Sequence, residues 1–312
     1  MNGPLLVTNA SGLFGRRVIH HLTHTLRVPA GLIVATCRDP ANLYPLVYRG
    51  VVARRVDPDD EAQLIDTFRG MARILLIGSD ADRPELTVQQ RQRAISAAAQ
   101  AGVQHLIYTS VPYPAGSPVL HAQVHAATEA AIEGSSLPGW TLLRNHRTFE
   151  AFFTTLPTIL AQQGVWFSAA GDGRMADIGS DDLALAAACE LTSFSQGKHT
   201  YTLSGLEATT TAEQAQLVGA VLGRRIQVIP VEAEDLVRAL LGAGHSRDDA
   251  QLIASFDRAS ASGHRSHVSH DFQRLTDRPP ITIAKWLARN LSAITACKKP
   301  CDLLGVLPVS LR

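Results

Sequence analysis

The chain has 312 residues, 46% of them hydrophobic and 18% charged, which fits one large globular domain or a domain with a smaller lobe. Its 29 lysines and arginines balance 28 aspartates and glutamates, and this net charge of +1 argues against a nucleic-acid or anionic-membrane surface. No stretch reaches the roughly 18 uninterrupted apolar residues of a membrane span, and nothing resembles a signal peptide. We therefore expect a cytoplasmic protein whose four cysteines are reduced thiols.

Through the first half of the chain, short apolar strands alternate with helix-like segments. The predicted strands comprise residues 5–8, 32–37, 51–53, 74–77, 104–109 and 140–144. The predicted helices comprise residues 13–25, 59–70, 85–101 and 119–133. Continuous apolar strands separated by helices indicate a parallel sheet covered on both faces. Right-handed crossovers then give an α/β, doubly wound sheet of the Rossmann type.

The second half is less regular and predicts a smaller α+β lobe. Its expected helices comprise residues 149–163, broken at Pro157, and residues 181–191, 211–222 and 232–257. Its expected strands comprise residues 165–168, 200–203 and 226–229. Residues 259–269 are rich in Ser, Ala and His, and we expect them to form a loop or a mobile segment.

The first strand leads directly into Asn9-x-x-Gly12-x-x-Gly15 and then into a helix. Such a strand-turn-helix junction directs backbone N–H groups and a helix N-terminus toward a diphosphate. Gly12 lets the backbone approach the phosphates, and Gly15 lets the helix pack against the sheet. The first position needs a positive φ and is usually glycine, but asparagine tolerates the left-handed region better than most residues. A plain strand-to-helix turn is the alternative interpretation.

The end of the second strand predicts which dinucleotide binds. An acidic residue there would bind the ribose 2′-hydroxyl of NAD, whereas an arginine accommodates the 2′-phosphate of NADP. The strand ends at Arg38, and the first acidic residue is Asp39. We therefore expect NADP(H) as the preferred cofactor, with NAD(H) as the alternative, unless Arg38 is only a surface charge.

Three stretches resemble the NmrA-like branch of atypical short-chain dehydrogenases: TNASGLFG at 8–15, VATCRDPA at 34–41 and YTS at 108–110. Within that branch the chain resembles NADPH-dependent quinone reductases and triphenylmethane reductases. Supporting stretches are HAATE at 125–129, TLLRN at 141–145 and AAGDGR at 169–174. The resemblance runs from about residue 4 to about residue 290. It implies a dinucleotide-binding Rossmann domain at 1–148 and a mainly substrate-binding lobe at 149–312, with some strands returning to the Rossmann sheet.

The resemblance also implies which residues contact the cofactor. They are Thr8, Asn9, Ser11, Gly12, Leu13 and Phe14 along the diphosphate, Arg38 at the adenosine phosphate, Asp57 near the adenine, and Gly78, Ser79, Thr109, Ser110 and Val111 beside the nicotinamide ribose. The chain departs from the family pattern at two positions. The first glycine is replaced by Asn9, and Ala130 stands where a lysine often follows the Thr-Glu pair.

The Tyr-x-x-x-Lys pair of ordinary short-chain dehydrogenases is absent, because the first lysine of the chain is Lys198. His125 is our first candidate for a proton donor, since imidazole titrates near neutral pH. It lies about where the isoflavone-reductase relatives place their catalytic lysine, and a polar helix residue without proton transfer is the alternative. Asn145 and His146 follow the sixth strand, and Tyr113 follows the fifth. Each can hydrogen-bond a substrate oxygen or only the local backbone.

Two clusters suggest a metal site at first sight. His264, His267 and His270 are spaced by three, and Cys297 and Cys301 form a C-x3-C pair. No carboxylate or cysteine pattern completes a known zinc site, so we expect no metal.

The residues and the resemblance together predict an NAD(P)H-dependent reductase that transfers hydride to a small molecule, a quinone-like or polycyclic aromatic ketone. Such electrophilic acceptors need little acid catalysis, which suits a site without the Tyr-Lys pair. The Lys-poor, Ala/Arg-rich composition is typical of high-GC bacterial proteins, where such reductases also tailor aromatic polyketides. A non-catalytic NADP(H)-binding redox sensor is the alternative, with a cofactor-dependent isomerase or dehydratase third. We expect no nucleic-acid or membrane partner, and a homodimer stays open.

Overall fold

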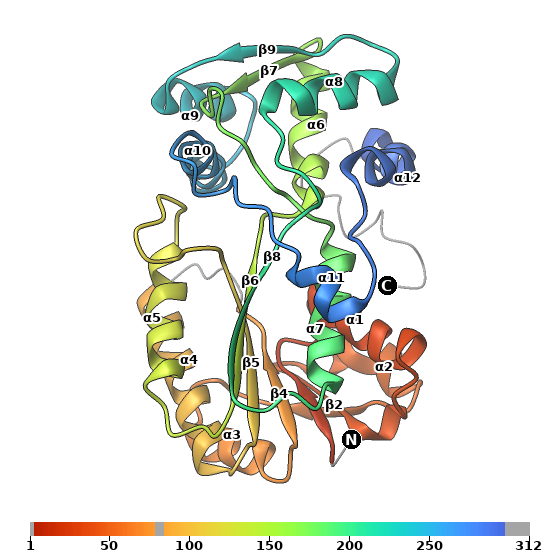
Figure 1. The fold of residues 1–312 in the computed structure, drawn as a ribbon, viewed down its shortest axis with the longest axis vertical. Helices are drawn as coiled ribbons and strands as arrows, with labels where there is room; N and C mark the ends of the chain where they lie inside the picture. Colours follow the sequence, from red (N-terminus) through yellow and green to blue (C-terminus); the bar gives the residue numbers. More distant parts are fainter. Residues whose placement is uncertain (1–2, 79–83, 297–312) are drawn as a thin grey trace.

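The computed structural model describes residues 3–78 and 84–296 of the chain. These residues form a Rossmann-type sheet with helices on both faces and a second lobe stacked on it along the long axis (Figure 1). Of the residues singled out from the sequence, Ser79 and the pair Cys297 and Cys301 lie outside the described part.

The main sheet has seven strands in the order β3-β2-β1-β4-β5-β6-β8, and every neighbouring pair is parallel. The strands are β1 (Leu5–Val7), β2 (Ile33–Cys37), β3 (Val52–Arg55), β4 (Arg73–Leu76), β5 (His105–Ser110), β6 (Trp140–Asn145) and β8 (Lys198–Leu203). The direction of winding reverses between β1 and β4, so the doubly wound α/β fold expected from the sequence is confirmed. Sheets of this kind bind ligands at the carboxyl edge of that switch point.

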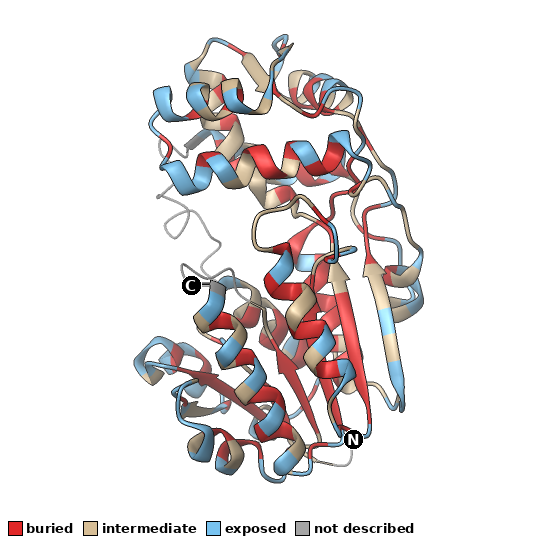
Figure 2. Cartoon of the chain, turned by 90° about the vertical axis from the view of Figure 1, so that its left-hand side faces the viewer, coloured by how far each residue is buried: buried red, intermediate tan, exposed pale blue. Residues whose placement is uncertain are grey.

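Strand β1 shows why the strands are continuously apolar. Leu5 and Val7 belong to the core on one face of the sheet, and Leu6 belongs to the core on the other face. Because both faces are covered, side chains of both alternating sets must be hydrophobic. Figure 2 shows these buried strands between helices whose outer faces are exposed.

Two helical layers cover the sheet. One layer contains α1 (Leu13–His20) with a π-helical continuation (His21–Thr25), α7 (Ser180–Thr192) and α11 (Asp271–Thr276). The opposite layer contains α3 (Glu61–Phe68), α4 (Pro84–Gln100) and α5 (Ala122–Glu133). Short helical turns connect β2 and its neighbours, namely Ala30–Leu32, Pro40–Leu43 and α2 (Tyr44–Val47).

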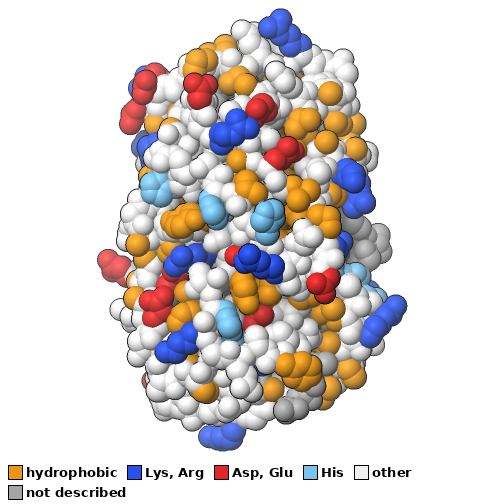
Figure 3. Space-filling view, in the orientation of Figure 1, with side chains coloured by type: hydrophobic (Ala, Val, Ile, Leu, Met, Phe, Trp, Pro, Cys, Tyr) orange, Lys and Arg blue, Asp and Glu red, His pale blue; other side chains and the backbone are white. Residues whose placement is uncertain are grey.

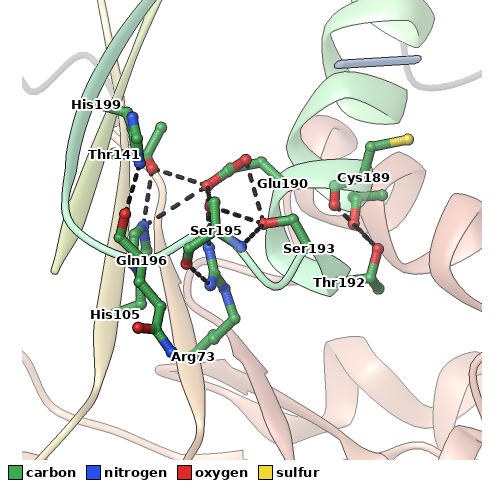
Figure 4. Close-up of polar contacts among 11 residues, drawn as sticks. Arg73, His105, Thr141, Cys189, Glu190, Thr192, Ser193, Ser195, Gln196 and His199 are labelled. Atoms are coloured by element: carbon green, nitrogen blue, oxygen red, sulfur yellow. Dashed lines mark hydrogen bonds and ion pairs between the residues drawn. The ribbon is translucent and has the colours of Figure 1, made fainter. Parts of the chain in front are cut away.

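A buried polar cluster attaches α7 to the sheet (Figure 4). Glu190 of α7 accepts hydrogen bonds from Arg73 of β4 (2.9 Å), Thr141 of β6 (2.8 Å) and Ser195 (2.8 Å). His105 of β5 bonds the same threonine hydroxyl at 2.8 Å, and burial lowers the pKa of this histidine to about 3. The chain therefore returns to the Rossmann sheet after residue 180, through α7, β8 and α11.

The second lobe is built around two smaller hydrophobic cores. The first is formed by a turn (Phe149–Ala151), α6 (Phe152–Ala161), α8 (Thr211–Leu222) and α12 (Ile283–Ala296). The second is formed by α9 (Ala233–Gly242) and α10 (Arg247–Ala261). A two-stranded parallel sheet of β7 (Val165–Ser168) and β9 (Gln227–Pro230) closes the lobe.

Two helix expectations for this lobe were wrong. Helix α6 continues through Pro157, with Leu156 before the proline and Ile159 after it anchored in the core. The segment 232–257 is divided into two helices. Gly244 at φ +91° breaks the helix, and Ser246 caps the N-terminus of α10.

The segment expected as a loop or mobile stretch is anchored. Helix α10 extends to Ala261, and the loop that follows contains Arg265, only 5% exposed. The Arg265 guanidinium donates hydrogen bonds to Asp177 and to the Ser260 hydroxyl. This buried cation holds the loop against the rest of the lobe.

No helix in the described part of the chain combines the length and apolarity that crossing a bilayer requires. On the face shown in Figure 3, acidic and basic side chains are interspersed, in line with the net charge of +1.

Candidate functional site

A cavity of about 670 Å³ opens at the carboxyl ends of β1 and β2, next to the switch point of the sheet. This volume lies within the usual range of cofactor sites, roughly 300–1,000 Å³. Four of the predicted cofactor residues line the cavity, namely Thr8, Asn9, Ser11 and Arg38. The remaining predicted residues that are described lie outside its walls: Gly12, Leu13, Phe14, Asp57, Gly78, Thr109, Ser110 and Val111.

The turn after β1 has the conformation that a diphosphate-binding turn needs. Asn9 adopts a left-handed conformation with φ 49°, and its carbonyl accepts a hydrogen bond from Gly12 N at 3.2 Å. A Cβ atom on Gly15 would lie 2.7 Å from the Ala10 Cα, so α1 packs directly on the turn. Asn9 and Ser11 of this turn line the cavity and directly precede the N-terminus of α1, so the residues present fit a dinucleotide.

Thr8 connects this turn to the neighbouring strand. Its hydroxyl donates to the Leu75 carbonyl at 3.1 Å and accepts from Ile77 N at 3.0 Å. Asp57 is exposed, and its carboxylate accepts a hydrogen bond from Asp59 N at 3.0 Å. Thr8 and Asp57 are therefore both held by hydrogen bonds to nearby backbone groups.

Two arginines lie near the end of β2, although the sequence indicated only one. Arg38 is exposed on the cavity wall and makes no hydrogen bond within the described residues. Arg16 of α1 donates from Nε to the Ser11 carbonyl (2.9 Å) and from Nη2 to the Asn42 carbonyl (2.6 Å). The Asp39 carboxylate accepts from Ala41 N at 3.0 Å and caps the short turn there. Arg16 was missed because it lies one turn into a helix, where an arginine is usually only exposed.

The ends of β4 and β5 approach each other closely at Gly78. Its N–H donates to the Thr109 hydroxyl at 2.7 Å. A Cβ atom at this position would lie 2.5 Å from the Thr109 carbonyl oxygen and 3.1 Å from His125 Cε1. Only glycine fits at this position. The close approach brings together Gly78, Thr109 and His125, which the sequence analysis had singled out separately.

His125 lies inside a hydrogen-bonded chain and not on the surface of the cleft. Its Nδ1 is 2.9 Å from the Tyr108 hydroxyl, which accepts a hydrogen bond from Arg91 at 2.8 Å. Burial and, to a smaller extent, the Arg91 charge lower the pKa of His125 to about 3. The imidazole is therefore neutral at pH 7, which favours a hydrogen-bonding role over that of a stored proton donor.

Polar atoms without partners gather at the ends of β5 and β6. Four buried side-chain atoms here lack hydrogen bonds within residues 3–78 and 84–296. They are the Ser110 hydroxyl oxygen, the side-chain amide oxygen of Asn145 and both ring nitrogens of His146. Ser110 pairs in register with Arg144, the residue before Asn145. Buried polar groups without partners are costly, which makes these atoms candidates for contact with a ligand, although their residues line none of the cavities described here. Burial lowers the pKa of His146 to about 4, so its ring is neutral.

Tyr113 differs from this buried group in its exposure. Tyr113 is 41% exposed, has φ 47°, and contacts the ring of His267 edge-on at 6.0 Å between centroids. The histidines at 264, 267 and 270 do not converge. Across the described residues, no three His, Cys, Asp or Glu side chains are arranged to hold a metal ion.

A second, smaller cavity of about 60 Å³ lies in the second lobe and was not predicted. Its polar end is formed by Arg147, Asp177 and Asp257. The only sequence feature that could have indicated this cavity is the position of Arg147, two residues after the end of β6. The two aspartates come from distant segments that no local pattern connects.

Comparison with known proteins gives close relatives over nearly the whole chain. No family model matches the chain. Quinone oxidoreductase 2 of Escherichia coli is 31% identical over 90% of this chain and 96% of its own length. The (4-alkanoyl-5-oxo-2,5-dihydrofuran-3-yl)methyl phosphate reductase of Streptomyces griseus is 29% identical over 93% and 98%. The crystal structure of Citrobacter sp. triphenylmethane reductase with NADP(H) has a TM-score of 0.83 and 30% identity, covering 92% of this chain and 99% of that one.

Proposed function

The chain belongs to the family of NmrA-like oxidoreductases that includes quinone oxidoreductase 2, and we propose that it reduces a quinone-like or polycyclic aromatic ketone with NADPH. The protein is an NAD(P)H-dependent oxidoreductase that acts on a small molecule. The observation that carries the proposed acceptor is the group of buried, unpartnered polar atoms at Ser110, Asn145 and His146.

The preferred cofactor is NADP(H), and the arginines near β2 support this choice. The 2′-phosphate needs a cation with free donors, and Arg38 lies on the cavity wall with none of its donors engaged by the described residues. Arg16 adds a second positive charge at the same end. The Asp39 carboxylate, which would favour the 2′-hydroxyl of NAD, is occupied in capping a turn. The triphenylmethane reductase crystallised with NADP(H) is consistent with this assignment.

In our proposal the first part of the chain binds the cofactor and the second part mainly binds the acceptor. Residues 1–148 hold the cofactor, with Asn9, Gly12 and Gly78 allowing the backbone to approach it. Residues 149–312 mainly bind the acceptor, except for α7, β8 and α11, which return to the sheet. Bound NADPH supplies the hydride.

Binding and orientation of the acceptor are the tasks left to the side chains at the carboxyl edge. The Ser110 hydroxyl can donate a hydrogen bond to a carbonyl oxygen, and the neutral His146 ring can donate another. Such donors stabilise negative charge that develops on the oxygen during hydride transfer. One quinone, one NADPH and one solvent proton give one hydroquinone and one NADP⁺. An electrophilic quinone therefore needs no stored proton at His125.

For the origin of the acceptor we propose aromatic polyketide tailoring, on the ground of composition alone. The alternative function is a non-catalytic NADP(H) sensor. It is favoured by Asn9 in place of the first glycine, by Ala130 in place of the family lysine, and by the absence of a Tyr-Lys pair.

The test is anaerobic consumption of NADPH with a panel of quinones, anthraquinones and polycyclic ketones. We expect one NADP⁺ per hydroquinone, and retention of deuterium from C4-labelled NADPH in the alcohol formed from a ketone. We expect Ser110→Ala to lower kcat with little change in NADPH affinity. Ser96→Ala, on the exposed side of α4, is the matched control. NADPH binding without turnover of any acceptor would contradict the proposal and favour the sensor.

A further inference from the structure

The cavity in the second lobe has an apolar body and a charged end. Phe152, Trp166, Leu236 and Ile253 contribute to its apolar walls. Its volume of about 60 Å³ corresponds to room for about four water-sized groups. The cavity therefore suits a compact polar group attached to a hydrophobic skeleton.

Among the described residues, the side chain of Arg147 at the charged end has no hydrogen-bond or ion-pair partner. Its guanidinium lies over the Phe256 ring, with Cζ 4.5 Å from the centroid. Within the part of the chain that the structure describes, it forms no hydrogen bond and no ion pair. A guanidinium carries five N–H donors. Arg147 is half-buried, and none of its nitrogen atoms is among the fully buried unpartnered ones, so its donors are open to a ligand or to solvent. Burial lowers the pKa of Arg147 to about 10, so the cation persists at neutral pH.

The two nearby carboxylates are engaged elsewhere. Asp177 is ion-paired with Arg265, and both are buried. Asp257 accepts hydrogen bonds at Oδ2 from the Ser168 hydroxyl (2.9 Å) and from Ala169 N (2.8 Å). Neither aspartate comes within ion-pair distance of Arg147, so an acceptor for this guanidinium has to come from outside these residues.

Arg147 also lies directly beyond the edge where the acceptor carbonyl is placed. It follows Asn145 and His146 in the chain, and its carbonyl accepts a hydrogen bond from Ile178 N at 3.1 Å. This bond joins the segment after β6 to the segment that leads into α7, where Ile178 belongs to the core of the main sheet. With the reactive carbonyl at Ser110 and His146, as proposed above, Arg147 is the neighbouring residue in the chain at which a second substituent of the substrate can bind.

We propose that Arg147 binds an oxyanion substituent, a carboxylate or a phosphate, carried by the natural acceptor. The planar fork of arginine matches two oxygens of such a group, and stacking on Phe256 leaves its N–H edge free for them. The apolar walls bind the adjoining skeleton. The inference rests on the proposed function for the place of the reactive carbonyl, but oxyanion binding itself requires no turnover.

The first test measures binding without catalysis. Calorimetric titration of the NADP⁺-saturated protein uses 2-naphthoate, 2-naphthyl phosphate and neutral 2-naphthamide. We expect at least one anion to bind about 10- to 100-fold more tightly than the amide. The tighter of the two anions identifies the class of substituent. Equal binding of all three probes would overturn the inference.

Variants show whether the preference resides at Arg147. Arg147→Met should abolish it, and Arg147→Lys should retain a part. Arg258→Met removes the same charge from the exposed side of α10 and should leave the preference unchanged. An anion preference that persists in folded Arg147→Met, as judged by thermal melting, would also overturn the inference. If Arg147→Met fails to fold, Arg147→Lys, which keeps the charge, decides the question: a partial loss of the preference supports the site, and an unchanged preference overturns the inference.

The second test separates this inference from the proposed function. We expect Arg147→Met to lower kcat/KM for anthraquinone-2-carboxylate about 10-fold or more, with little effect on its methyl ester. Anion binding through Arg147 without reduction of any quinone would refute the proposed function and support the site. Reduction of quinones with equal kcat/KM for acid and ester, in wild type and variant alike, would refute the site and support the function.

Discussion

Arg144 at the end of β6 and Glu129 on α5 form a bidentate ion pair, with Nε 3.0 Å and Nη2 2.7 Å from the two carboxylate oxygens. Glu129 is 5% exposed. The pair joins the strand that ends at Asn145 to the helix that carries His125. Two stretches that the sequence showed separately, HAATE and TLLRN, therefore act as one structural unit.

Replacing Glu129 with Gln should destabilise the protein by about 2–3 kcal/mol, because a partly buried guanidinium loses its counter-charge. Chemical denaturation measures this free energy of unfolding. Asp66→Asn, which breaks the exposed pair with Arg69, is the matched control and should have little effect. Equal stability of Glu129→Gln and the wild type would show that the pair contributes nothing.

Substitutions of Asn9 test whether the turn after β1 binds the diphosphate of the cofactor. Asn9→Gly should keep NADPH binding close to that of the wild type, because glycine adopts φ 49° without strain. Asn9→Val should weaken NADPH binding by about 10-fold or more, since a β-branched residue is a genuine outlier at positive φ. Fluorescence titration with NADPH gives both affinities. Normal binding by Asn9→Val would rule out this turn as the diphosphate site.

Substitution of Arg38 tests whether this residue gives the preference for NADPH over NADH. Arg38→Ala should lower kcat/KM for NADPH by about 10- to 100-fold and leave kcat/KM for NADH nearly unchanged, because only NADPH carries the 2′-phosphate. Arg55→Ala, an exposed arginine at the end of β3, is the control. Arg16→Ala should weaken both cofactors, since it also loses its bonds to the Ser11 and Asn42 carbonyls. A parallel loss for both cofactors in Arg38→Ala would remove it from the 2′-phosphate site.

Burial of His125 predicts a loss of stability in acid. Its pKa falls from 6.5 to about 3 on folding, so the unfolded chain binds more protons between these values. Stability is therefore retained above pH 6.5 and lost as the pH falls toward 3. For this one residue the loss between pH 7 and pH 5 is about 2 kcal/mol.

The measurement is the free energy of unfolding of the wild type and of His125→Gln at both pH values. The variant cannot take up a proton at this position, so its loss should be smaller by about the same amount. An identical pH dependence in the two proteins would mean that His125 takes up its proton with the same pKa in the folded and unfolded states.

Much of the fold follows from local patterns. The apolar runs predicted the six strands of the first half. In the central strands both faces are covered and must be hydrophobic, as Leu5, Leu6 and Val7 illustrate, whereas the edge strand β3 has no buried residue. The positive φ at Asn9 and the tight packing at Gly15 were also foreseeable. They depend on residues within a few positions of one turn. Pro157 misled because its helix is held by distant core contacts that outweigh the local penalty.

By itself the sequence determined the doubly wound sheet, the cofactor turn and the arginine at the end of β2. These are set by interactions between near neighbours and by the alternation of polar and apolar residues. Only the tertiary structure decided that His125 is neutral and that the Ser110 hydroxyl and the His146 ring lack partners among the described residues. It also decided that Arg147 lies near two aspartates engaged elsewhere. The physical reason is that protonation and hydrogen-bond satisfaction depend on burial and on groups contributed by distant segments, which sequence neighbours do not reveal.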